Sequence, residues 1–417
     1  MEKTSVTIEG GHELNGVIDV FGAKNAVLPI LSSTIMLDGE TTLLNIPPIG
    51  DINSMVRMLN SLNIRTEYRA GGSIHILNQK KIRHIAPYEL VTAMRASFFV
   101  AGPLLAKTGF AKVPLPGGCS IGLRPVDIHI QGLKKLGVDI NFEHGFVEFS
   151  ALNLKGDAID LPFPSVGATE NIMMAACLAK GETVINNAAR EPEVVDLANF
   201  LIKAGAVIEG HGTSSIFVQG VQSLMGVRDY FVIPDRIEIG TLLIAGGITG
   251  GCVEIKHVHS SYLSSITDVL DEAGLIISYD NNNVRCSANG SIHPVDITTE
   301  PHPGFPTDMQ AQMMALLSIA CGKSVIKETI FENRFMHVNE LVRMGASIQV
   351  DGQIAIVSGG KLSGADVKIT DLRAGAALVL AGLIAEGKTV VHGLHHLNRG
   401  YFNLMGKLKS LGARLDL

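Results

Sequence analysis

The sequence contains no tryptophan, only five cysteines and few charged residues, and each of these shortages narrows the class of protein. Charged residues make up 18% of the chain and hydrophobic residues 46%, a composition that excludes disorder as the main state. The cysteines are odd in number and widely spaced, without a C-x-x-C pair, which argues against a disulfide framework and a zinc knuckle. Cys177 and Cys321 fall in apolar helical runs, so we expect both thiols to pack in the core.

A basic surface and a membrane-spanning run are also missing. The formal net charge of −6 favours neither nucleic acid nor an anionic membrane as a partner. The longest uncharged apolar run covers residues 374–385 and is well below the ~18 residues that span a bilayer. Residues 4–8 alternate as a strand does and do not resemble a signal peptide. We therefore expect a cytoplasmic protein.

Six copies of one helix-to-strand pattern organise the 417 residues. Each copy ends an amphipathic helix at a glycine, or at Asn63 in the first copy, and an alternating strand follows. We expect that glycine or asparagine to adopt the left-handed conformation that ends many helices. The copies start between 67 and 74 residues apart, at Leu59, Leu133, Leu201, Leu270, Leu341 and Leu408.

This repeating unit mixes helices with strands and therefore predicts an α/β fold. A chain of this length suits two domains of ~200 residues, which gives three copies to each domain. Residues 172–178 and 374–385 are apolar on all sides, so we expect helices inside the domains with sheets packed around them. Residues 227–239 lie near the middle of the chain and are expected to cross from one domain to the other.

The segment around Lys24 is the first candidate for chemistry. A strand is expected to end at Gly22 and a helix to begin beside Lys24. The ammonium group would then lie next to free main-chain N–H groups, an arrangement that suits an anion. The alternative is an ordinary surface lysine.

A glycine-rich segment around Cys119 is the second candidate. Pro-Gly-Gly precedes this cysteine and Gly122 follows it, which disfavours a helix or a central strand and predicts an exposed loop. Arg124 is close in sequence and would favour the reactive thiolate. The alternative is an incidental loop cysteine.

Three further positions carry two interpretations each. Ser165 opens an apolar helix whose N-terminus would hold a phosphate, or Ser165 simply caps that helix. Asp308 follows a proline-rich turn. It either displays a binding carboxylate on a rigid scaffold or caps the next helix. Asp371 and Arg373 belong to a binding loop or form a surface ion pair.

The histidines do not predict a metal site. His392 and His396 are four residues apart, a spacing that would converge on a metal if the segment were helical. Gly393 and the preceding strand pattern argue against a helix there.

Taken together, these segments resemble the enolpyruvyl transferases, and the resemblance runs along essentially the whole chain. The most specific segments are residues 22–25, 95–97, 116–127, 165–169, 188–193, 305–312, 331–337 and 371–373. So many long motifs in one order are more specific than any one of them. The chain departs from the common family pattern at Phe21, Gly50 and Phe163.

The family fold is a pair of inside-out α/β domains, each of three repeated β/α units with buried helices, which close over the substrates. In the family the N-terminal strand belongs to the C-terminal domain. The resemblance therefore implies a C-terminal domain of residues 1–21 and 233–417. It implies an N-terminal domain of residues 22–232, which carries Cys119 on a lid loop.

The resemblance is strongest to members that act on a sugar nucleotide. It implies transfer of the enolpyruvyl group of phosphoenolpyruvate to the 3′-hydroxyl of UDP-N-acetylglucosamine, by addition and elimination, with release of phosphate. This reaction is the first committed step of peptidoglycan synthesis. No metal or organic cofactor is implied, and we expect a monomer or weak oligomer. Two alternatives remain open: the shikimate-pathway enolpyruvyl transferase, and a non-catalytic paralogue that binds the sugar nucleotide.

The resemblance also implies roles for individual residues. Cys119 is implied to be a proton donor and the residue that the antibiotic fosfomycin alkylates, Asp308 the general base, and Asp371 a group beside the reacting centre. The cations implied to bind phosphoenolpyruvate are Lys24, Arg95, Arg124, Arg334, Arg373 and Arg399, and of these Lys24 and Arg399 are also implied to be catalytic. The positions implied to hold the sugar nucleotide are Asn25, Ser165, Val166, Gly167, Asp308 and Ile330, and Pro125 is implied to bind substrate.

Overall fold

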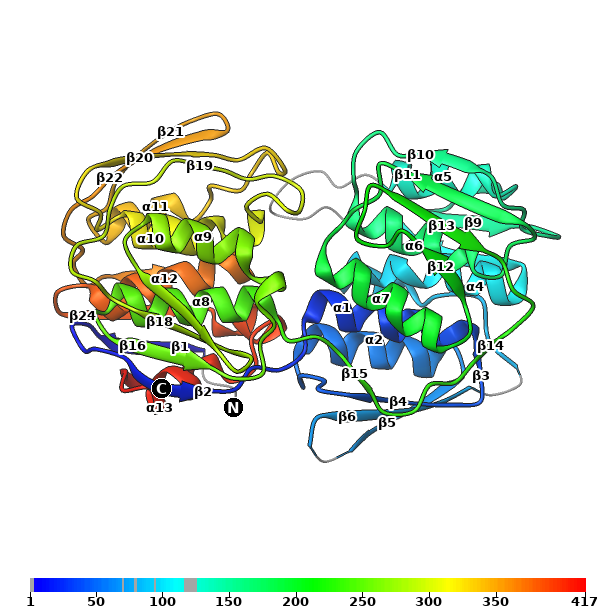
Figure 1. Ribbon diagram of the computed structural model, residues 1–417, viewed down its shortest axis with the longest axis horizontal. Coiled ribbons are helices and arrows are strands. Elements are labelled where there is room, and N and C mark those ends of the chain that lie inside the picture. Colours follow the sequence, from blue (N-terminus) through cyan, green and yellow to red (C-terminus); the bar gives the residue numbers. More distant parts are fainter. Residues whose placement is uncertain (1–3, 70, 79–80, 94, 116–125) are drawn as a thin grey trace. The chain divides into compact units, whose positions relative to one another are not determined.

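The fold is known from a computed structural model, which describes residues 4–69, 71–78, 81–93, 95–115 and 126–417. The described residues form two compact units (Figure 1). One unit contains the residues up to Val20 together with Pro234–Leu417, and it is called the C unit below. The other contains the described residues from Phe21 to Ile233 and is called the N unit. The chain therefore leaves one unit for the other next to Pro234.

Three four-stranded sheets form the outer layer of the C unit. The first has the order β2-β16-β18-β17, with bounds Asn15–Ile18, Cys252–Ile255, Asn283–Ser287 and Ile276–Asp280. The second has the order β19-β20-β22-β21, with bounds Ile297–Thr298, Lys323–Lys327, Ile354–Ser358 and Ser347–Asp351. The third has the order β23-β24-β1-β25, with bounds Asp366–Lys368, Lys388–His392, Ser5–Glu9 and Arg414–Asp416.

The N unit carries sheets of the same kind. The first has the order β15-β4-β6-β5, with bounds Tyr230–Phe231, Glu40–Leu44, Ser73–Asn78 and Ile64–Arg69. The second has the order β7-β9-β8, with bounds Phe110–Pro114, Phe146–Ser150 and Asp139–Glu143. The third has the order β10-β11-β13-β12, with bounds Ala158–Asp160, Glu182–Asn186, Ser215–Gln219 and Val207–Glu209. A short pair joins β3 (Leu37–Asp38) to β14 (Leu224–Met225).

All the four-stranded sheets share one pattern of strand directions. The first strand is parallel to the second, and the two remaining neighbours pair antiparallel, as in β10-β11-β13-β12. The three-stranded sheet completes this pattern through a parallel bridge between Ile85 and Lys112. The six units of the sequence repeat therefore share one strand topology, three in each half of the molecule.

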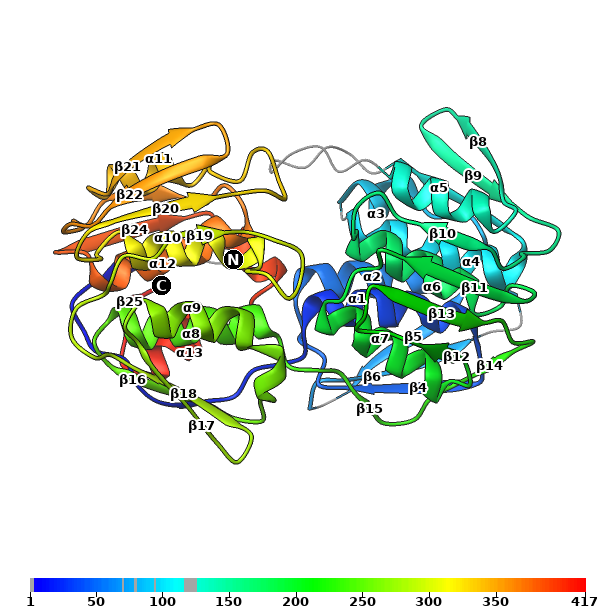
Figure 2. The same cartoon turned by 45° about the horizontal axis from the view of Figure 1, so that its top comes forward.

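Apolar helices fill the space that the sheets enclose. All residues of α8 are buried, and α10 and α12 pack against it, with the sheets of the C unit around them (Figures 1 and 2). The inner helices are α8 (Arg236–Ile248), α10 (Gln310–Leu317) and α12 (Leu372–Ile384) in the C unit, and α1 (Lys24–Ser33), α4 (Ala101–Thr108) and α6 (Val166–Ala176) in the N unit. The prediction that residues 172–178 and 374–385 are internal is confirmed. Burying one leucine fully in such a core contributes about 2 kcal/mol.

Outer helices lie between the core and the strands that follow them. They are α2 (Gly50–Ser61), α3 (Tyr88–Ala93), α5 (Asp127–Lys135), α7 (Pro192–Lys203), α9 (Ser264–Glu272), α11 (Val338–Arg343) and α13 (Leu404–Ser410). At the six repeated helix ends the second residue after the helix has positive φ: Asn63, Gly137, Gly205, Gly274, Gly345 and Gly412. The left-handed conformation expected from the sequence is therefore confirmed in all six copies.

Two of the cysteine predictions have opposite outcomes. Cys177 is buried, and burial raises the pKa of its thiol to about 12. Cys321 is exposed, so the core prediction was wrong for it, because α10 ends at Leu317 and Cys321 lies in the turn before β20. Across the described part of the chain, no helix is both long and apolar enough to cross a membrane.

Candidate active site

In the C unit the structure brings three of the predicted site residues into direct contact. Asp308 lies in a 3-10 turn, η4 (Thr307–Met309), at the start of α10. Its Oδ1 atom accepts a hydrogen bond from the Arg334 guanidinium at 2.7 Å, and its Oδ2 atom accepts one from Arg373 at 2.8 Å. Both arginine side chains are nearly buried, whereas Asp308 is 27% exposed. The cluster thus joins two cations to one partly accessible carboxylate, which suits the binding of an anionic substrate.

This arrangement decides between the two interpretations of Asp308. The helix α10 has no side-chain cap, and the carboxylate of Asp308 is bound by the two arginines. The capping interpretation was therefore wrong. The proline-rich turn before Asp308 instead presents the carboxylate toward residues that lie far away in the sequence.

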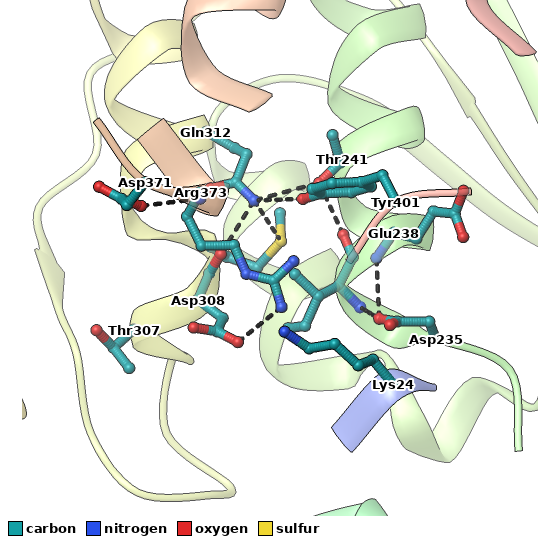
Figure 3. A network of polar contacts seen from close by, with 12 residues as sticks. Lys24, Asp235, Glu238, Thr241, Thr307, Asp308, Gln312, Asp371, Arg373 and Tyr401 are labelled. Carbon is teal, nitrogen blue, oxygen red and sulfur yellow. Dashed lines mark hydrogen bonds and ion pairs between the residues drawn. The ribbon is translucent and has the colours of Figure 1, made fainter. Parts of the chain in front are cut away.

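A buried polar network adjoins the cluster (Figure 3). The Arg373 guanidinium carbon lies 5.5 Å from the centre of the Tyr401 ring, within the range of a cation–π interaction. The Tyr401 hydroxyl is 3.0 Å from Thr241 Oγ1 and 3.2 Å from Gln312 Nε2. Gln312 also donates to the main-chain oxygen of Asp308 at 3.0 Å. Each of these contacts limits the freedom of Arg373 or Asp308.

Asp371 caps α12. Its Oδ1 atom accepts hydrogen bonds from the main-chain N–H groups of Arg373 at 2.9 Å and Ala374 at 3.1 Å. The surface ion pair between Asp371 and Arg373 is therefore not the arrangement observed, because the arginine side chain turns to Asp308. The cap fixes the start of the helix that carries Arg373.

Two more predicted site residues, Ile330 and Arg399, lie in the C unit, as does the buried His337. Burial lowers the pKa of His337 to about 4, with smaller effects from the charges of Asp371 and Arg334, so its imidazole is neutral near pH 7. Ile330 follows β20 and is half-buried. Arg399 is exposed at the end of η5 (Leu394–Arg399).

In the N unit Lys24 is the first residue of α1. Its Nζ atom lies 3.3 Å from Asp51 Oδ2, and both side chains are largely buried. The interpretation of Lys24 as an ordinary surface lysine was therefore wrong. Asn25 follows in the first turn of the same helix, where main-chain N–H groups are free of helical partners.

Ser165, Val166 and Gly167 form the start of α6. The Ser165 hydroxyl accepts a hydrogen bond from Ala168 N at 3.4 Å, which agrees with the capping interpretation. A Cβ atom on Gly167 would lie 3.3 Å from the His129 ring, so a larger residue would crowd that ring at the start of the helix. The cap occupies only one of the free N–H groups, and the geometry leaves the phosphate interpretation open.

Cys119, Arg124 and Pro125 lie outside the described residues, as does the side chain of Arg95. Among the described side chains, no group of three histidine, cysteine, aspartate or glutamate residues is arranged to hold a metal ion.

Sequence reasoning missed the groups that hold the predicted residues in place. These groups are Asp51, Thr241, Gln312, His337 and Tyr401. Gln312 and His337 lie in the motif segments 305–312 and 331–337, but no local pattern shows that these groups meet. Thr241 and Gln312 are polar residues within apolar helical runs, and this was the local signal that could have drawn attention to them.

Comparison with known proteins gives the class to which this fold and site belong. The sequence model of the family described as EPSP synthase (3-phosphoshikimate 1-carboxyvinyltransferase) matches residues 8–408. The solved structure of the enolpyruvyl transferase NikO from Streptomyces tendae has a TM-score of 0.90 at 24% identity, covering 99% of this chain and 98% of that chain. EPSP synthase from Acinetobacter baumannii has a TM-score of 0.77 at 17% identity, with both chains covered in full. The chain belongs to this family, the enolpyruvyl transferases.

The relatives that share about half of their residues with this chain form a narrower group. UDP-N-acetylglucosamine 1-carboxyvinyltransferase 1 of Staphylococcus epidermidis is 51% identical over 415 residues, which is 99% of this chain and 98% of that protein. The protein of the same name from Caldanaerobacter subterraneus is 50% identical over 414 residues, 99% of each chain. The fold predicted from the repeat and the family resemblance is therefore confirmed.

Proposed function

We propose that the protein transfers the enolpyruvyl group of phosphoenolpyruvate to the 3′-hydroxyl of UDP-N-acetylglucosamine and releases phosphate. The observation that carries the proposal is the 50–51% identity, over nearly the whole chain, to relatives named for this activity. The shikimate-pathway reaction is less well supported, because the EPSP synthase structure shares only 17% identity and shows the fold alone. The product would feed peptidoglycan synthesis.

The reaction takes place in two steps. The acceptor hydroxyl loses its proton to a base and adds to C2 of phosphoenolpyruvate, while C3 receives a proton from an acid. C3 then loses a proton and the bond from C2 to the phosphate oxygen breaks, which restores the double bond and releases phosphate. These steps need a bound anion, a placed carboxylate and an acid.

Asp308 is our choice for the base. Its carboxylate is partly exposed, which a group that meets a substrate hydroxyl requires, and two guanidinium groups fix its orientation. Cys119 is our choice for the acid, on the basis of its glycine-rich segment and the family resemblance. Asp371 is proposed to lie beside the reacting carbon.

The cations are proposed to bind the charged groups of phosphoenolpyruvate. Guanidinium groups match carboxylate and phosphate in a bidentate way, and an ammonium at a helix start adds a further charge. The proposed set is Lys24, Arg95, Arg124, Arg334, Arg373 and Arg399. The proposed sugar-nucleotide set is Asn25, Ser165, Val166, Gly167, Asp308 and Ile330, and Pro125 is proposed to bind substrate.

Three broader properties belong to the same proposal. The two units are proposed to be domains, with boundaries close to residues 22 and 232. Phosphoenolpyruvate and nucleotide sugars are intermediates of the cytoplasm, so the proposed reaction would take place there. The proposed chemistry requires no metal or organic cofactor and no partner chain.

The acceptor decides between the candidate functions. Phosphate release from phosphoenolpyruvate is measured without an acceptor, with UDP-N-acetylglucosamine, and with shikimate 3-phosphate. We expect saturable phosphate release when UDP-N-acetylglucosamine is the acceptor, and no release in the other two mixtures. Release with shikimate 3-phosphate only would transfer the assignment to the shikimate-pathway reaction. A thermal shift with UDP-N-acetylglucosamine but no phosphate release would indicate the non-catalytic paralogue.

A further inference from the structure

Glu328 is a buried carboxylate that the proposed reaction does not use. It follows β20 directly and is 1% exposed. Its Oε2 atom accepts a hydrogen bond from the Thr307 hydroxyl at 2.9 Å. Its Oε1 atom accepts hydrogen bonds from the main-chain N–H groups of Ile330 at 2.9 Å and Phe331 at 3.1 Å. A buried carboxylate is costly unless donors surround it, and here three donors do so.

The bond from Thr307 joins two segments across 21 positions of the sequence, and the other two bonds hold Glu328 to the main chain of its own segment. The segment from Thr299 to Asp308 carries the proposed base, and the segment from Glu328 to Arg334 carries Ile330 and one of the arginines. The segments are also joined where Thr329 N donates to Thr299 Oγ1 at 2.9 Å and Thr329 Oγ1 donates to Thr299 O at 2.5 Å. Arg334 adds a bond to Asp308 at their other end. Glu328 therefore lies between two other contacts of these segments, Thr329 with Thr299 and Arg334 with Asp308.

We propose that Glu328 is a positioning residue for the sugar nucleotide. It sets the main chain at Ile330 relative to Thr307 and Asp308, so that both segments present their groups to the same acceptor. The inference rests on the proposed function, in which Asp308 and Ile330 bind UDP-N-acetylglucosamine. Glu328 acts through these neighbours and does not itself contact the substrate.

The chemistry of this carboxylate separates a positioning role from a structural one. The change Glu328→Gln retains an oxygen for the two N–H groups, and its amide nitrogen is able to donate to the Thr307 hydroxyl. The change Glu328→Ala removes all three bonds. A residue that only supports folding would lower the amount or the melting temperature of active enzyme, but it would not change the affinity for one substrate selectively.

The test measures the dissociation constant of UDP-N-acetylglucosamine by calorimetry, and the KM values of both substrates. We expect Glu328→Ala to weaken sugar-nucleotide binding about 10-fold or more, the effect of leaving buried donors unpaired. We expect the KM of phosphoenolpyruvate to change less than about 2-fold and Glu328→Gln to recover most of the affinity. Thr307→Val removes one bond, is the milder variant if the alanine variant does not fold, and should weaken binding about 3-fold.

Glu340 provides a matched control. Its carboxylate also accepts a main-chain hydrogen bond, from Lys368 N at 2.9 Å, but it does not bridge to Thr307 or Ile330. Glu340→Ala should leave the affinity for UDP-N-acetylglucosamine unchanged. Equal weakening for both substrates, or a glutamine variant as weak as the alanine variant, would overturn the positioning role. Wild-type protein that binds the sugar nucleotide but does not release phosphate would overturn only the proposed reaction, and absence of binding would overturn both.

Discussion

At the scale of single residues, Asp308 is the centre of the C-unit polar cluster. Its two oxygen atoms each accept a bond from a different buried guanidinium. The change Asp308→Asn keeps the shape and one acceptor atom, but it removes the negative charge and the ability to take a proton. We expect turnover to fall ~100-fold or more, the scale for loss of an acid or base group, while sugar-nucleotide binding stays measurable by calorimetry. Unchanged turnover would remove Asp308 from the mechanism.

Cys119 carries a second prediction at this scale. We expect fosfomycin to add one covalent label to the protein, and Cys119→Ala to abolish that label in intact mass spectra. Cys177 is an internal control, because burial raises the pKa of its thiol to about 12 and keeps it unreactive. Persistent labelling of the Cys119→Ala protein would show that another residue reacts.

Asp196 should make the free energy of unfolding of the N unit depend on pH. Its carboxylate accepts hydrogen bonds from the Tyr230 hydroxyl at 2.6 Å and from Ile233 N at 3.3 Å. Burial raises the pKa of Asp196 to about 6, although these two bonds and Lys203 oppose the rise and Glu193 adds to it. The ordinary value is 3.8, so the folded protein holds this proton more tightly than the unfolded chain.

A raised folded-state pKa means that the stabilising contribution is complete below about pH 4 and is lost as the pH rises through about 6. We expect the free energy of unfolding to fall by up to ~3 kcal/mol over this window, relative to Asp196→Asn. Urea unfolding of both proteins at several pH values measures the difference. A difference that stays constant, or that grows as the pH rises, would contradict the assignment.

At the scale of elements, the helix-to-strand junctions were predictable and the polar network was not. A glycine after an amphipathic helix is a local signal, and all five repeated glycines and Asn63 have positive φ. By contrast, Asp308 meets Arg373 across 65 positions of the sequence, and Gln312 meets Tyr401 across 89. Such pairings depend on how the inner helices pack, which no local pattern records. For Cys321, local apolarity was misleading because the helix ends four residues earlier.

The repeated junctions also predict how a substitution is tolerated. Gly137 has a φ of +82° and no atom within 4 Å of an added Cβ, so only backbone strain opposes a side chain there. We expect Gly137→Ala to cost ~1 kcal/mol and Gly137→Asn clearly less, because Asn63 adopts the same conformation in the first copy. Gly360→Ala is the control, since Gly360 has open space without positive φ. Thermal unfolding that ranks the alanine variant at or above the asparagine variant would contradict this account.

At the scale of the whole molecule, the two units are built differently from the same sheet pattern. The N unit is closed by its own last strand, because β15 pairs with β4 in parallel. In the C unit, β1 lies between β24 and β25, so the first and last strands of the chain belong to one sheet. Neither closure is visible as a local pattern, although the N-terminal alternation of residues 4–8 indicated a strand.

This difference predicts that the N unit folds by itself. A fragment of residues 21–233 should unfold cooperatively in denaturant, since its sheets and inner helices are all contained in it. Removing residues 224–233 from the fragment deletes β14 and β15 and should lower its stability. Gradual, non-cooperative unfolding of the longer fragment would argue against two domains.

Phosphorus NMR of one reaction mixture tests the central claim most directly. Protein, phosphoenolpyruvate and UDP-N-acetylglucosamine are mixed, and all phosphorus signals are followed together. We predict that the phosphoenolpyruvate signal is replaced by inorganic phosphate in equal amount, while the diphosphate signals of the sugar nucleotide persist. A proton spectrum of the same sample should show the vinyl protons of one enolpyruvyl ether for each phosphate released. Loss of phosphoenolpyruvate without that ether, or no change in any signal, would contradict enolpyruvyl transfer to the sugar nucleotide.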